Sequence, residues 1–424
     1  MTSEPVVLSF ADLGLSTAMV QRAAAAGWTA PSAIQRAALP AILQGRDVLG
    51  QAPTGSGKTA AFLLPLLQRL LAEPGRAGER PRRLRALILA PTRELAAQIG
   101  KVAKLLAPEL KAVIAVGGLS INPQMMTLRG GADLLVATPG RLLDLVDHNA
   151  LRLTDVAVCV LDEADRLLDL GFADEIGRVL ALLPVRRQTL MFSATLPDEV
   201  AALAGRVLQD PLRVDAPPDQ EGADPPIVQR AIEVDTARRT PLLRHLIKTE
   251  AWDRVLVFVA TQYATEHVAD KLRQGGLPAA ALHGQLSQGR RSQALADFHS
   301  RAVTVLVATD LAARGIDVVQ LAAVVNHDLP RSVVDYTHRI GRTGRAGTAG
   351  VAVSFICADA PGSEAHFRVI ENRRQQRVPR EQVAGFEPAA VVAPVLQADP
   401  TGGVKGRRKS KKDKLREAAG RSSR

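Results

Sequence analysis

The sequence predicts an α/β fold with two domains in series, each built on a mainly parallel sheet with helices on both faces. Short apolar runs of strand length alternate with longer amphipathic runs of helix length. The alternation stops once, at a stretch rich in proline and acidic residues, and then resumes. Buried strands that alternate with helices are typical of parallel sheets covered on both faces.

The first set of elements lies before residue 215. Amphipathic stretches at 60–71, 94–106 and 174–183 are expected to be helices. Short aliphatic and β-branched runs are expected to be strands, at 48–50, 86–90, 113–116, 134–137, 156–161 and 189–192. Together they predict a first domain over residues 1–214.

The second domain follows a linker. Residues 215–226 read DAPPDQEGADPP, and their four prolines cannot continue a helix or a central strand. Strand-like runs then return, at 254–260, 279–282, 304–308, 322–326 and 350–356. We therefore expect a second domain over residues 227–376, and an extension over 377–424 whose basic end is predicted to be disordered.

The positive charge is concentrated at the end of the chain. The whole chain has 54 Lys and Arg against 43 Asp and Glu, a net charge of +11. Residues 405–424 hold ten basic and two acidic residues, which is +8, so only +3 remains for residues 1–404. A basic chain favours an acidic partner, with nucleic acid first. The tail either tethers nucleic acid without base specificity or serves solubility alone.

Several classes of protein are excluded by composition. Two cysteines cannot build a disulfide framework or a cysteine-rich zinc site. No apolar run approaches the roughly 20 residues that a membrane helix needs, and no signal peptide precedes residue 10. Aromatic residues make up only 3% of the chain, which disfavours rows of stacked rings as the main binding mode. We expect a soluble, cytoplasmic protein with no membrane partner.

The sharpest local signal is the stretch APTGSGKT at residues 52–59. It follows an expected strand and precedes an expected helix, which is the context of a phosphate-binding loop. Lys58 is placed to reach the β- and γ-phosphates of ATP, and Thr59 to ligate Mg²⁺. The remaining loop residues expected to hold the nucleotide are Thr54, Gly55, Ser56 and Gly57.

Carboxylates follow another strand of the same expected sheet. Asp162 and Glu163 come directly after residues 156–161. This position suits Asp162 for holding Mg²⁺, and Glu163 for orienting or deprotonating the attacking water. An acidic helix N-terminus stabilised by the helix dipole is the plain alternative. With the phosphate loop upstream, one nucleotide site is the better interpretation.

These motifs resemble those of DEAD-box RNA helicases of superfamily 2, and of the bacterial RhlE-type subgroup in particular. The resemblance covers about residues 8–376 and keeps the family's order of motifs. It implies two RecA-like domains, an RNA-dependent ATPase, and ATP and Mg²⁺ as cofactors. The block GWTAPSAIQ at 27–35 resembles the Q motif, so Gln35 would bind the adenine edge and Phe10 would pack on the base. Ser32 stands where the family usually has threonine.

The resemblance also assigns RNA, coupling and ribose positions. Gly315 and Asp317 would approach the nucleotide from the second domain. Ser193, Thr195 and His338 would couple the site through the acidic motif at Asp165. Loops rich in backbone amides, hydroxyls and guanidinium groups suit the sugar-phosphate backbone of RNA. The residues that the resemblance places there are Pro91, Thr92, Arg93, Gly117, Gly118, Thr138, Arg141, His283, Gly284, Gln288, Arg291, Thr309 and Asp310.

Two arginines complete the expected site. Arg342 and Arg345 lie three residues apart in the stretch YTHRIGRTGR. The first domain has a nucleotide loop and no cationic clamp, while the second has arginines and no such loop. One ATP site between the domains, with these arginines as fingers, is the economical inference, and such fingers are worth about 10³–10⁵ in rate.

The combined interpretation is an ATP-dependent RNA helicase that locally unwinds or remodels short RNA duplexes or RNA–protein complexes. RNA, as single strands and short duplexes, is the expected partner, and ribosomal or RNA-decay proteins are further partners. The core is expected to be monomeric. Two alternatives remain open at this point: an ATP-gated RNA clamp that does not unwind, and a translocase on double-stranded DNA.

Overall fold

The computed structural model describes residues 8–53, 55–73, 82–216, 227–313, 321–344, 350–360 and 362–389. Four predicted site residues lie outside these ranges, as do most of the expected linker and the basic tail. The four residues are Thr54, Gly315, Asp317 and Arg345. Within the described ranges, no helix has both the length and the apolar character that crossing a membrane requires.

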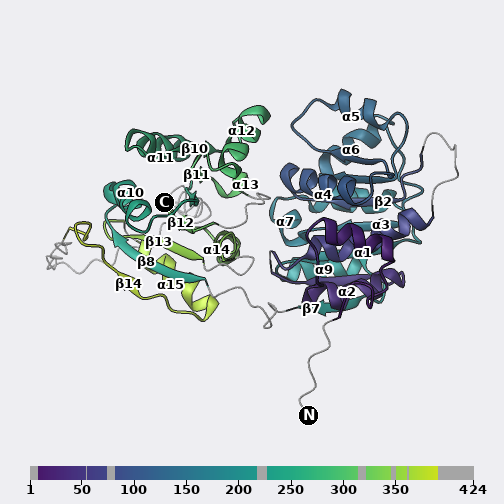
Figure 1. Cartoon of the computed structure of the whole chain (residues 1–424), viewed down its shortest axis with the longest axis horizontal. Helices are drawn as coiled ribbons and strands as arrows, with labels where there is room; N and C mark the ends of the chain where they lie inside the picture. The colour runs from purple at the N-terminus through teal and green to yellow at the C-terminus, as the bar shows by residue number, and fades with distance from the viewer. Residues whose placement is uncertain are drawn as a thin grey trace, which may run out of the picture. The chain divides into compact units, whose positions relative to one another are not determined.

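The first domain is built on a seven-stranded sheet in which every strand pair is parallel, in the order β3-β4-β2-β5-β6-β1-β7. In Figure 1 this part of the chain runs from purple to teal. Its strands are β1 Val48–Gln51, β2 Ala86–Leu89, β3 Ala112–Ala115, β4 Leu134–Ala137, β5 Val158–Leu161, β6 Gln188–Ser193 and β7 Leu212–Asp215.

Nine helices are described in the first domain. They are α1 Thr17–Ala25, α2 Ala33–Leu43, α3 Lys58–Ala72, α4 Arg93–Leu106, α5 Ile121–Leu128, α6 Pro139–Asp147, α7 Ala164–Asp169, α8 Ala173–Leu182 and α9 Asp198–Val207. Apolar residues of α1 to α4 pack with one face of the sheet, and those of α5 to α9 with the other. Both faces of the sheet are therefore covered.

Strand β2 illustrates why its sequence is apolar at every position. Successive side chains of a strand point to opposite faces. Ala86 and Ile88 belong to the core beneath α1 to α4, while Leu87 and Leu89 belong to the core beneath α5 to α9. All four residues are buried, so no position of the strand is left for a polar side chain.

The second domain repeats this architecture. Its seven strands are also paired in parallel, in the order β10-β11-β9-β12-β13-β8-β14. Figure 1 draws it from teal through green to yellow. The strands are β8 Val228–Val234, β9 Val255–Phe258, β10 Ala279–Leu282, β11 Val305–Ala308, β12 Ala323–Asn326, β13 Val351–Cys357 and β14 Arg380–Glu381.

Six α-helices and one 3₁₀ turn accompany this second sheet in the described part of the chain. Residues of α10 and α11 pack with one face, and residues of α12 and α13 with the other. Helices α14 and α15 form a third cluster against β8 and β13. The helices are α10 Arg239–Thr249, α11 Gln262–Gln274, α12 Gln288–His299, α13 Asp310–Ala313, α14 Val333–Ile340 and α15 Ser363–Arg374, and the 3₁₀ turn is Thr236–Arg238.

Two parallel sheets covered by helices on both faces confirm the predicted fold class. Three strands were not indicated by the sequence pattern. Strands β7 and β14 lie at sheet edges, and β8 lies inside the second sheet between β13 and β14. Strand β14 extends the second sheet past residue 376. A strand of two residues is too short to show a period, which is why the pattern fades there while the sheet continues.

A buried histidine makes the stability of the second domain sensitive to acid. His327 is 5% exposed, and its Nε2 lies 3.2 Å from Thr240 Oγ1. Burial, and next the charge of Arg239, lower its pKa to about 4, although the charge of Asp328 opposes this. The unfolded chain, with a histidine pKa near 6.5, therefore binds the proton at a pH where the folded chain does not.

We expect this histidine to contribute stability that is lost as the pH falls from about 6.5 to about 4, by up to about 3 kcal/mol. His327→Gln should flatten that part of the pH dependence. The measurement is the free energy of unfolding in urea at pH 7 and pH 4.5 for both proteins. An equal acid loss in wild type and variant would assign the effect to other groups.

Candidate nucleotide and RNA site

The phosphate-binding loop joins β1 to α3. Gly55 has φ 89° and Gly57 has φ 92°, a left-handed conformation that favours glycine. Lys58 is the first residue of α3 and is 7% exposed. Its Nζ donates to the carbonyl oxygens of Ala52 at 2.6 Å and Pro53 at 2.9 Å. The lysine thus lies inside the curve of the loop, where a phosphate-binding lysine belongs.

The loop also contains an unsatisfied polar atom. Ser56 Oγ is buried and has no hydrogen-bond partner among the described residues. Burial lowers the pKa of Lys58, while the charges of Asp162 and Glu163 act to raise it. A buried cation and an orphaned hydroxyl beside a helix N-terminus match the groups of a polyphosphate.

The block at 27–35 supports this loop from behind. Gln35 Oε1 accepts a hydrogen bond from Ser32 N at 3.0 Å, and Gln35 Nε2 donates to Gly57 O at 3.0 Å. Ser32 Oγ donates to Ser56 O at 2.7 Å. Phe10 is 2% exposed in the core with α1 to α3. The sequence did not predict the hydrogen bond from Gln35 to Gly57. The contacts of Gln35 and Phe10 with adenine remain predictions.

Gly57 provides a direct test of the loop geometry. A Cβ atom at this position would lie 2.3 Å from Gln35 Nε2 and 3.0 Å from Ser32 Oγ. Gly57→Ala should therefore raise the KM for ATP about tenfold, because the left-handed backbone costs roughly 1–2 kcal/mol and the loop must shift. The measurement is steady-state ATPase activity against ATP concentration.

The matched control is Gly177→Ala in α8, where a Cβ atom meets nothing within 4 Å. That variant should keep the KM and gain up to about 1 kcal/mol of stability. A wild-type KM in Gly57→Ala would contradict the assigned role of the loop.

The acidic motif lies at the carboxyl end of β5. Asp162 is 2% exposed and Glu163 is 9% exposed. Burial, and next the neighbouring charge of Glu163, raise the pKa of Asp162 to about 7, against the effect of Lys58. Glu163 has φ 50°, a left-handed conformation that is strained for a residue with a Cβ atom. Strain of this kind is commonly found at functional sites.

Arg166 keeps Glu163 in its charged form. Arg166 Nη1 lies 2.8 Å from Glu163 Oε2, and its side chain is 4% exposed. Burial acts to raise the pKa of Glu163, but Arg166, Arg342 and Lys58 outweigh it, so the pKa lies below its ordinary value. Arg166 is a site residue that sequence reasoning missed, although its position three residues after Glu163, which caps α7, was readable from the spacing.

Ser193 and Thr195 contact the acidic motif as expected from the sequence. Asp165 N donates to Ser193 Oγ at 3.2 Å. Asp165 Oδ2 accepts from Thr195 N at 2.9 Å and from Thr195 Oγ1 at 2.8 Å. These bonds tie the end of β6 to the start of α7. The coupling role of the three residues stays a prediction.

The donor set at this edge fits Mg²⁺. Thr59 supplies a hydroxyl oxygen and Asp162 a buried carboxylate, and hard divalent cations prefer such oxygens. A cation would also offset the burial of the Asp162 charge. Within the described ranges, no group of three or more His, Cys, Asp or Glu side chains is arranged as a metal cage.

The expected RNA loops of the first domain contact one another. Gly117 N donates to Thr138 Oγ1 at 3.2 Å. Gly118 has φ 71°, and a Cβ atom there would lie 2.5 Å from the Arg93 guanidinium carbon. Arg141 Nη2 donates to Leu119 O at 2.7 Å. The structure thus brings the loops after β2, β3 and β4 together at one edge of the sheet.

Two residues of this group, Thr92 and Arg141, form hydrogen bonds within the protein. Thr92 Oγ1 accepts from Leu95 N at 3.2 Å and caps α4. Arg141 is 7% exposed, and its contact with Leu119 holds the loop that follows β3. Pro91 is buried before α4. RNA contacts of these residues stay predictions.

The corresponding residues of the second domain are also engaged. His283 Nε2 lies 3.0 Å from Glu266 Oε1, and Arg291 Nη1 donates to His283 O at 3.3 Å. Arg291 also forms an ion pair with Glu94. Gly284 is exposed, whereas Gln288, the first residue of α12, and Thr309, after β11, are half-buried.

Arg339 is the second residue that sequence reasoning missed. It is 3% exposed and binds Asp310 with two nitrogens, at 2.5 Å and 2.7 Å. It also donates to Asn326 Oδ1 at 2.9 Å and lies over the ring of Phe258, 4.8 Å from its centroid. Its place inside the stretch YTHRIGRTGR was a signal, but arginine alone does not reveal which member of that stretch is structural.

His338 and Arg342 interact electrostatically with the acidic motif. His338 is 8% exposed, and burial, followed by the charge of Arg166, lowers its pKa to about 4, while Asp165 and Glu163 oppose this. Arg342 is 5% exposed and contributes to lowering the pKa of Glu163. The second domain thus supplies an arginine that acts on the carboxylate expected to handle the attacking water.

Comparison with known proteins agrees with this geometry. Residues 32–203 match the family model "DEAD/DEAH box helicase", and residues 238–347 match "Helicase conserved C-terminal domain". The chain is 41% identical to an ATP-dependent rRNA helicase rrp3 of Sclerotinia sclerotiorum over 83% of this chain and 72% of that protein. It is 42% identical to the DEAD-box ATP-dependent RNA helicase 28 of Oryza sativa, over 83% of this chain but only 44% of that protein.

Solved structures are similar as well. Dbp5 of S. cerevisiae bound to RNA and ADP BeF3 has a TM-score of 0.77 at 31% identity, covering 90% of this chain and 95% of that chain. Mss116p bound to ssRNA and AMP-PNP has a TM-score of 0.78 at 27% identity, covering 92% of this chain and 81% of that chain. With the motifs, the paired sheets and these similarities in agreement, the chain belongs to the DEAD-box family of ATP-dependent RNA helicases.

Proposed function

We propose that this chain hydrolyses ATP when RNA is bound and uses the cycle to separate short RNA duplexes locally. The observation that carries the proposal is the shared edge of the first sheet. The nucleotide loop after β1, the acidic motif after β5 and the loops after β2, β3 and β4 all follow carboxyl ends of parallel strands. This shared edge supports the proposal, because ligands of α/β sheets bind at the carboxyl ends of the strands.

In this proposal the first domain binds ATP. Lys58 binds the β- and γ-phosphates once its Nζ leaves the carbonyls of Ala52 and Pro53, and Ser56 Oγ gains an acceptor. Thr59 and Asp162 would hold Mg²⁺, and the ion would supply positive charge to offset the negative charge of the phosphates. Glu163, kept ionised by Arg166, accepts a proton from the attacking water.

The second domain completes the site in the same proposal. Arg342 stabilises charge on the transferred phosphoryl group, as an arginine finger does. Arg345 has the same assignment from the sequence. His338 couples the two domains through the acidic motif, and Ser193 and Thr195 pass a change at Asp165 to the end of β6.

RNA is bound through its backbone. The amides of Gly117 and Gly118 and the side chains of Arg93 and Thr138 suit phosphate and sugar, which carry little base information. Hence the physiological RNA is set by something other than these loops. Ribosomal RNA is one substrate to test, because the fungal relative is named an rRNA helicase. Protein partners in ribosome assembly or RNA decay, a monomeric core, a cytoplasmic location and the RhlE-type subgroup remain parts of this proposal.

A strand-displacement assay tests the proposal against its two rivals. We expect the full chain with ATP to release the short strand of a ten-base-pair RNA duplex, and RNA to stimulate ATPase activity more than DNA of matched sequence. ATP-dependent RNA binding without strand release would indicate a clamp. Stronger stimulation by duplex DNA would indicate a translocase. Each of these two outcomes would overturn the proposal.

A further inference from the structure

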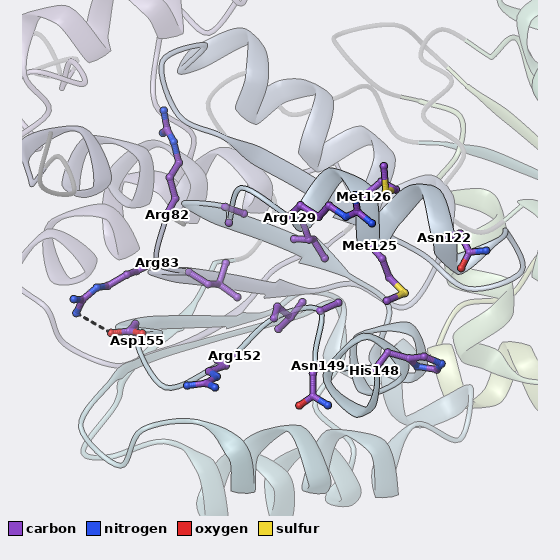
Figure 2. A pocket seen from close by; sticks show the side chains of 16 residues that line it. Arg82, Arg83, Asn122, Met125, Met126, Arg129, His148, Asn149, Arg152 and Asp155 are labelled. Atoms are coloured by element: carbon purple, nitrogen blue, oxygen red, sulfur yellow. Dashed lines mark hydrogen bonds and ion pairs between the residues drawn. The ribbon is translucent and has the colours of Figure 1, made fainter. Parts of the chain in front are cut away.

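A cavity of about 620 Å³ lies in the first domain, away from every motif described so far. Figure 2 shows it from close by, with Met125 and Met126 from α5, and His148 from the position directly after α6. The remaining lining comes from three short connections: the approach to β2, the approach to β4, and the segment that leads from α6 to β5.

This cavity is at the opposite edge of the sheet from the nucleotide loop. Its lining includes Leu84, Ala132 and Asp155, which precede β2, β4 and β5 by two to three residues. The nucleotide and RNA loops follow the carboxyl ends of the strands instead. A strand of four residues spans about 13 Å. An occupant of the cavity would therefore leave the ATP and RNA loops accessible.

The floor of the cavity is apolar. Leu84, Leu128 and Ala132 line it and are buried, and Met125 is half-buried beside them. Met126 also lines the cavity and is 55% exposed. Methionine adapts to irregular partners and is common at binding surfaces. The floor is therefore suited to an apolar side chain from elsewhere.

The rim of the cavity is basic. Four arginines line it against a single acidic residue, Asp155. Arg83 lies 3.3 Å from Asp155, and both side chains are largely exposed. Within the described part of the chain, Arg129 and Arg152 have no ion pair, and both are exposed. The rim therefore has uncompensated positive charge that would attract carboxylates.

We propose that this cavity docks a short acidic segment of a partner protein, anchored by at least one large apolar side chain. The volume falls within the usual range of about 300–1,000 Å³ for binding pockets. The basic rim would attract the acidic residues of the segment, and the leucine and methionine side chains of the floor would pack against its apolar anchor. The lining contains no Phe, Tyr or Trp, so it offers no stacking platform for bases, and phosphate binding would not need an apolar floor.

Segments of this chain fit less well. The basic stretch 405–424 has the same charge sign as the rim. The acidic stretch 215–226 has four carboxylates but contains no Leu, Ile, Met or Phe to fill the floor. Because neither segment combines acidic charge with a large apolar side chain, a separate protein is the favoured occupant of the cavity. The proposal does not depend on the proposed ATPase mechanism, because none of the lining residues belongs to it.

The test uses the full chain and a phage-displayed library of random 12-residue peptides. Wild type is panned beside Arg129→Glu/Arg152→Glu. The matched control is Lys101→Glu/Lys104→Glu, which makes the same change of charge at exposed positions of α4. Enriched peptides are synthesised with a fluorescein label, and their affinity is measured by fluorescence anisotropy.

We expect enriched peptides to be acidic, to contain Leu, Ile, Phe or Met, and to bind the rim variant at least tenfold more weakly than wild type or the control. Met126→Asp should weaken them as well, which tests the floor with a change at an exposed side chain. RNA-stimulated ATPase activity and the thermal unfolding midpoint should be the same in all variants.

Three results would overturn the proposal. The first is no enrichment on wild type over the rim variant, or equal binding to both. The second is weaker binding of fluorescein-labelled oligo-uridine to the rim variant without peptide enrichment, which would assign the surface to RNA. The third is rim-dependent binding of a synthetic peptide of residues 213–228 with no other peptide enriched, which would make the occupant a segment of this chain.

Discussion

Replacing Glu163 by glutamine is expected to reduce RNA-stimulated ATPase turnover about 10²–10⁴-fold, the range that a positioned general base contributes. The change removes the carboxylate charge and keeps the size of the side chain. Glu163 is suited to the role because Arg166 at 2.8 Å holds it in place and, with Arg342 and Lys58, keeps its pKa low despite burial. An ionised carboxylate at neutral pH can accept a proton from water, whereas the amide of glutamine cannot.

The measurement is the initial rate of phosphate release at saturating ATP and RNA. Binding of a fluorescent ATP analogue should persist in Glu163→Gln, since Lys58 and its loop are unchanged. The control is Glu199→Gln, an exposed carboxylate in the first turn of α9, which should keep wild-type turnover. Turnover within a factor of three of wild type in Glu163→Gln would contradict its role. A parallel loss of nucleotide binding would assign it to folding of the loop instead.

The two-sheet architecture could be predicted because buried parallel strands carry an unambiguous pattern. Strand β2 is apolar at all four positions. A strand with one face in solvent would instead alternate apolar and polar residues. Helix α3 begins two residues before the predicted start because Lys58 and Thr59 are already helical. That shift places the lysine at the helix N-terminus, where its charge and the dipole act on the same phosphates. Strand β14 could not be predicted, since two residues show no period.

The site was predicted less completely, and for a definite reason. A motif identifies residues that contact a ligand, whereas partners that position them are contributed by the fold. Arg339 binds Asp310 across 29 residues of chain. Gln35 reaches Gly57 across 22 residues. Such contacts depend on which strand ends are neighbours in the sheet, and strand order cannot be read from the local spacing of residues.

Arg342→Ala is expected to lower RNA-stimulated ATPase turnover by about 10³–10⁵, the value of an arginine finger. Arg342 is 5% exposed, and its charge helps to keep the pKa of Glu163 low, so the guanidinium acts on the same locus as the acidic motif. Its removal should therefore affect catalysis twice, by withdrawing charge from the transferring phosphoryl group and by weakening the field that keeps Glu163 ionised.

The two effects can be separated by Arg342→Lys. Lysine restores a point charge without the planar fork, so it should recover the ionised state of Glu163 but only part of the turnover. Single-turnover ATPase rates over a range of pH make the comparison. The alanine variant should show an apparent base pKa higher than wild type, and the lysine variant a wild-type pKa at reduced rate. Arg368→Ala, an exposed arginine of α15, is the control and should match wild type.

Measuring nucleotide binding shows whether Arg342 acts in catalysis or in the affinity for ATP. The loop that holds ATP in this proposal belongs wholly to the first domain, with Lys58 at its centre. An ATP analogue should therefore bind Arg342→Ala within a few-fold of wild type while turnover falls. A tenfold or smaller loss of turnover, or an equal loss of nucleotide affinity, would remove Arg342 from the transition state. Arg342 would then act only through its charge near Glu163, and the main contribution of the second domain would be to RNA binding.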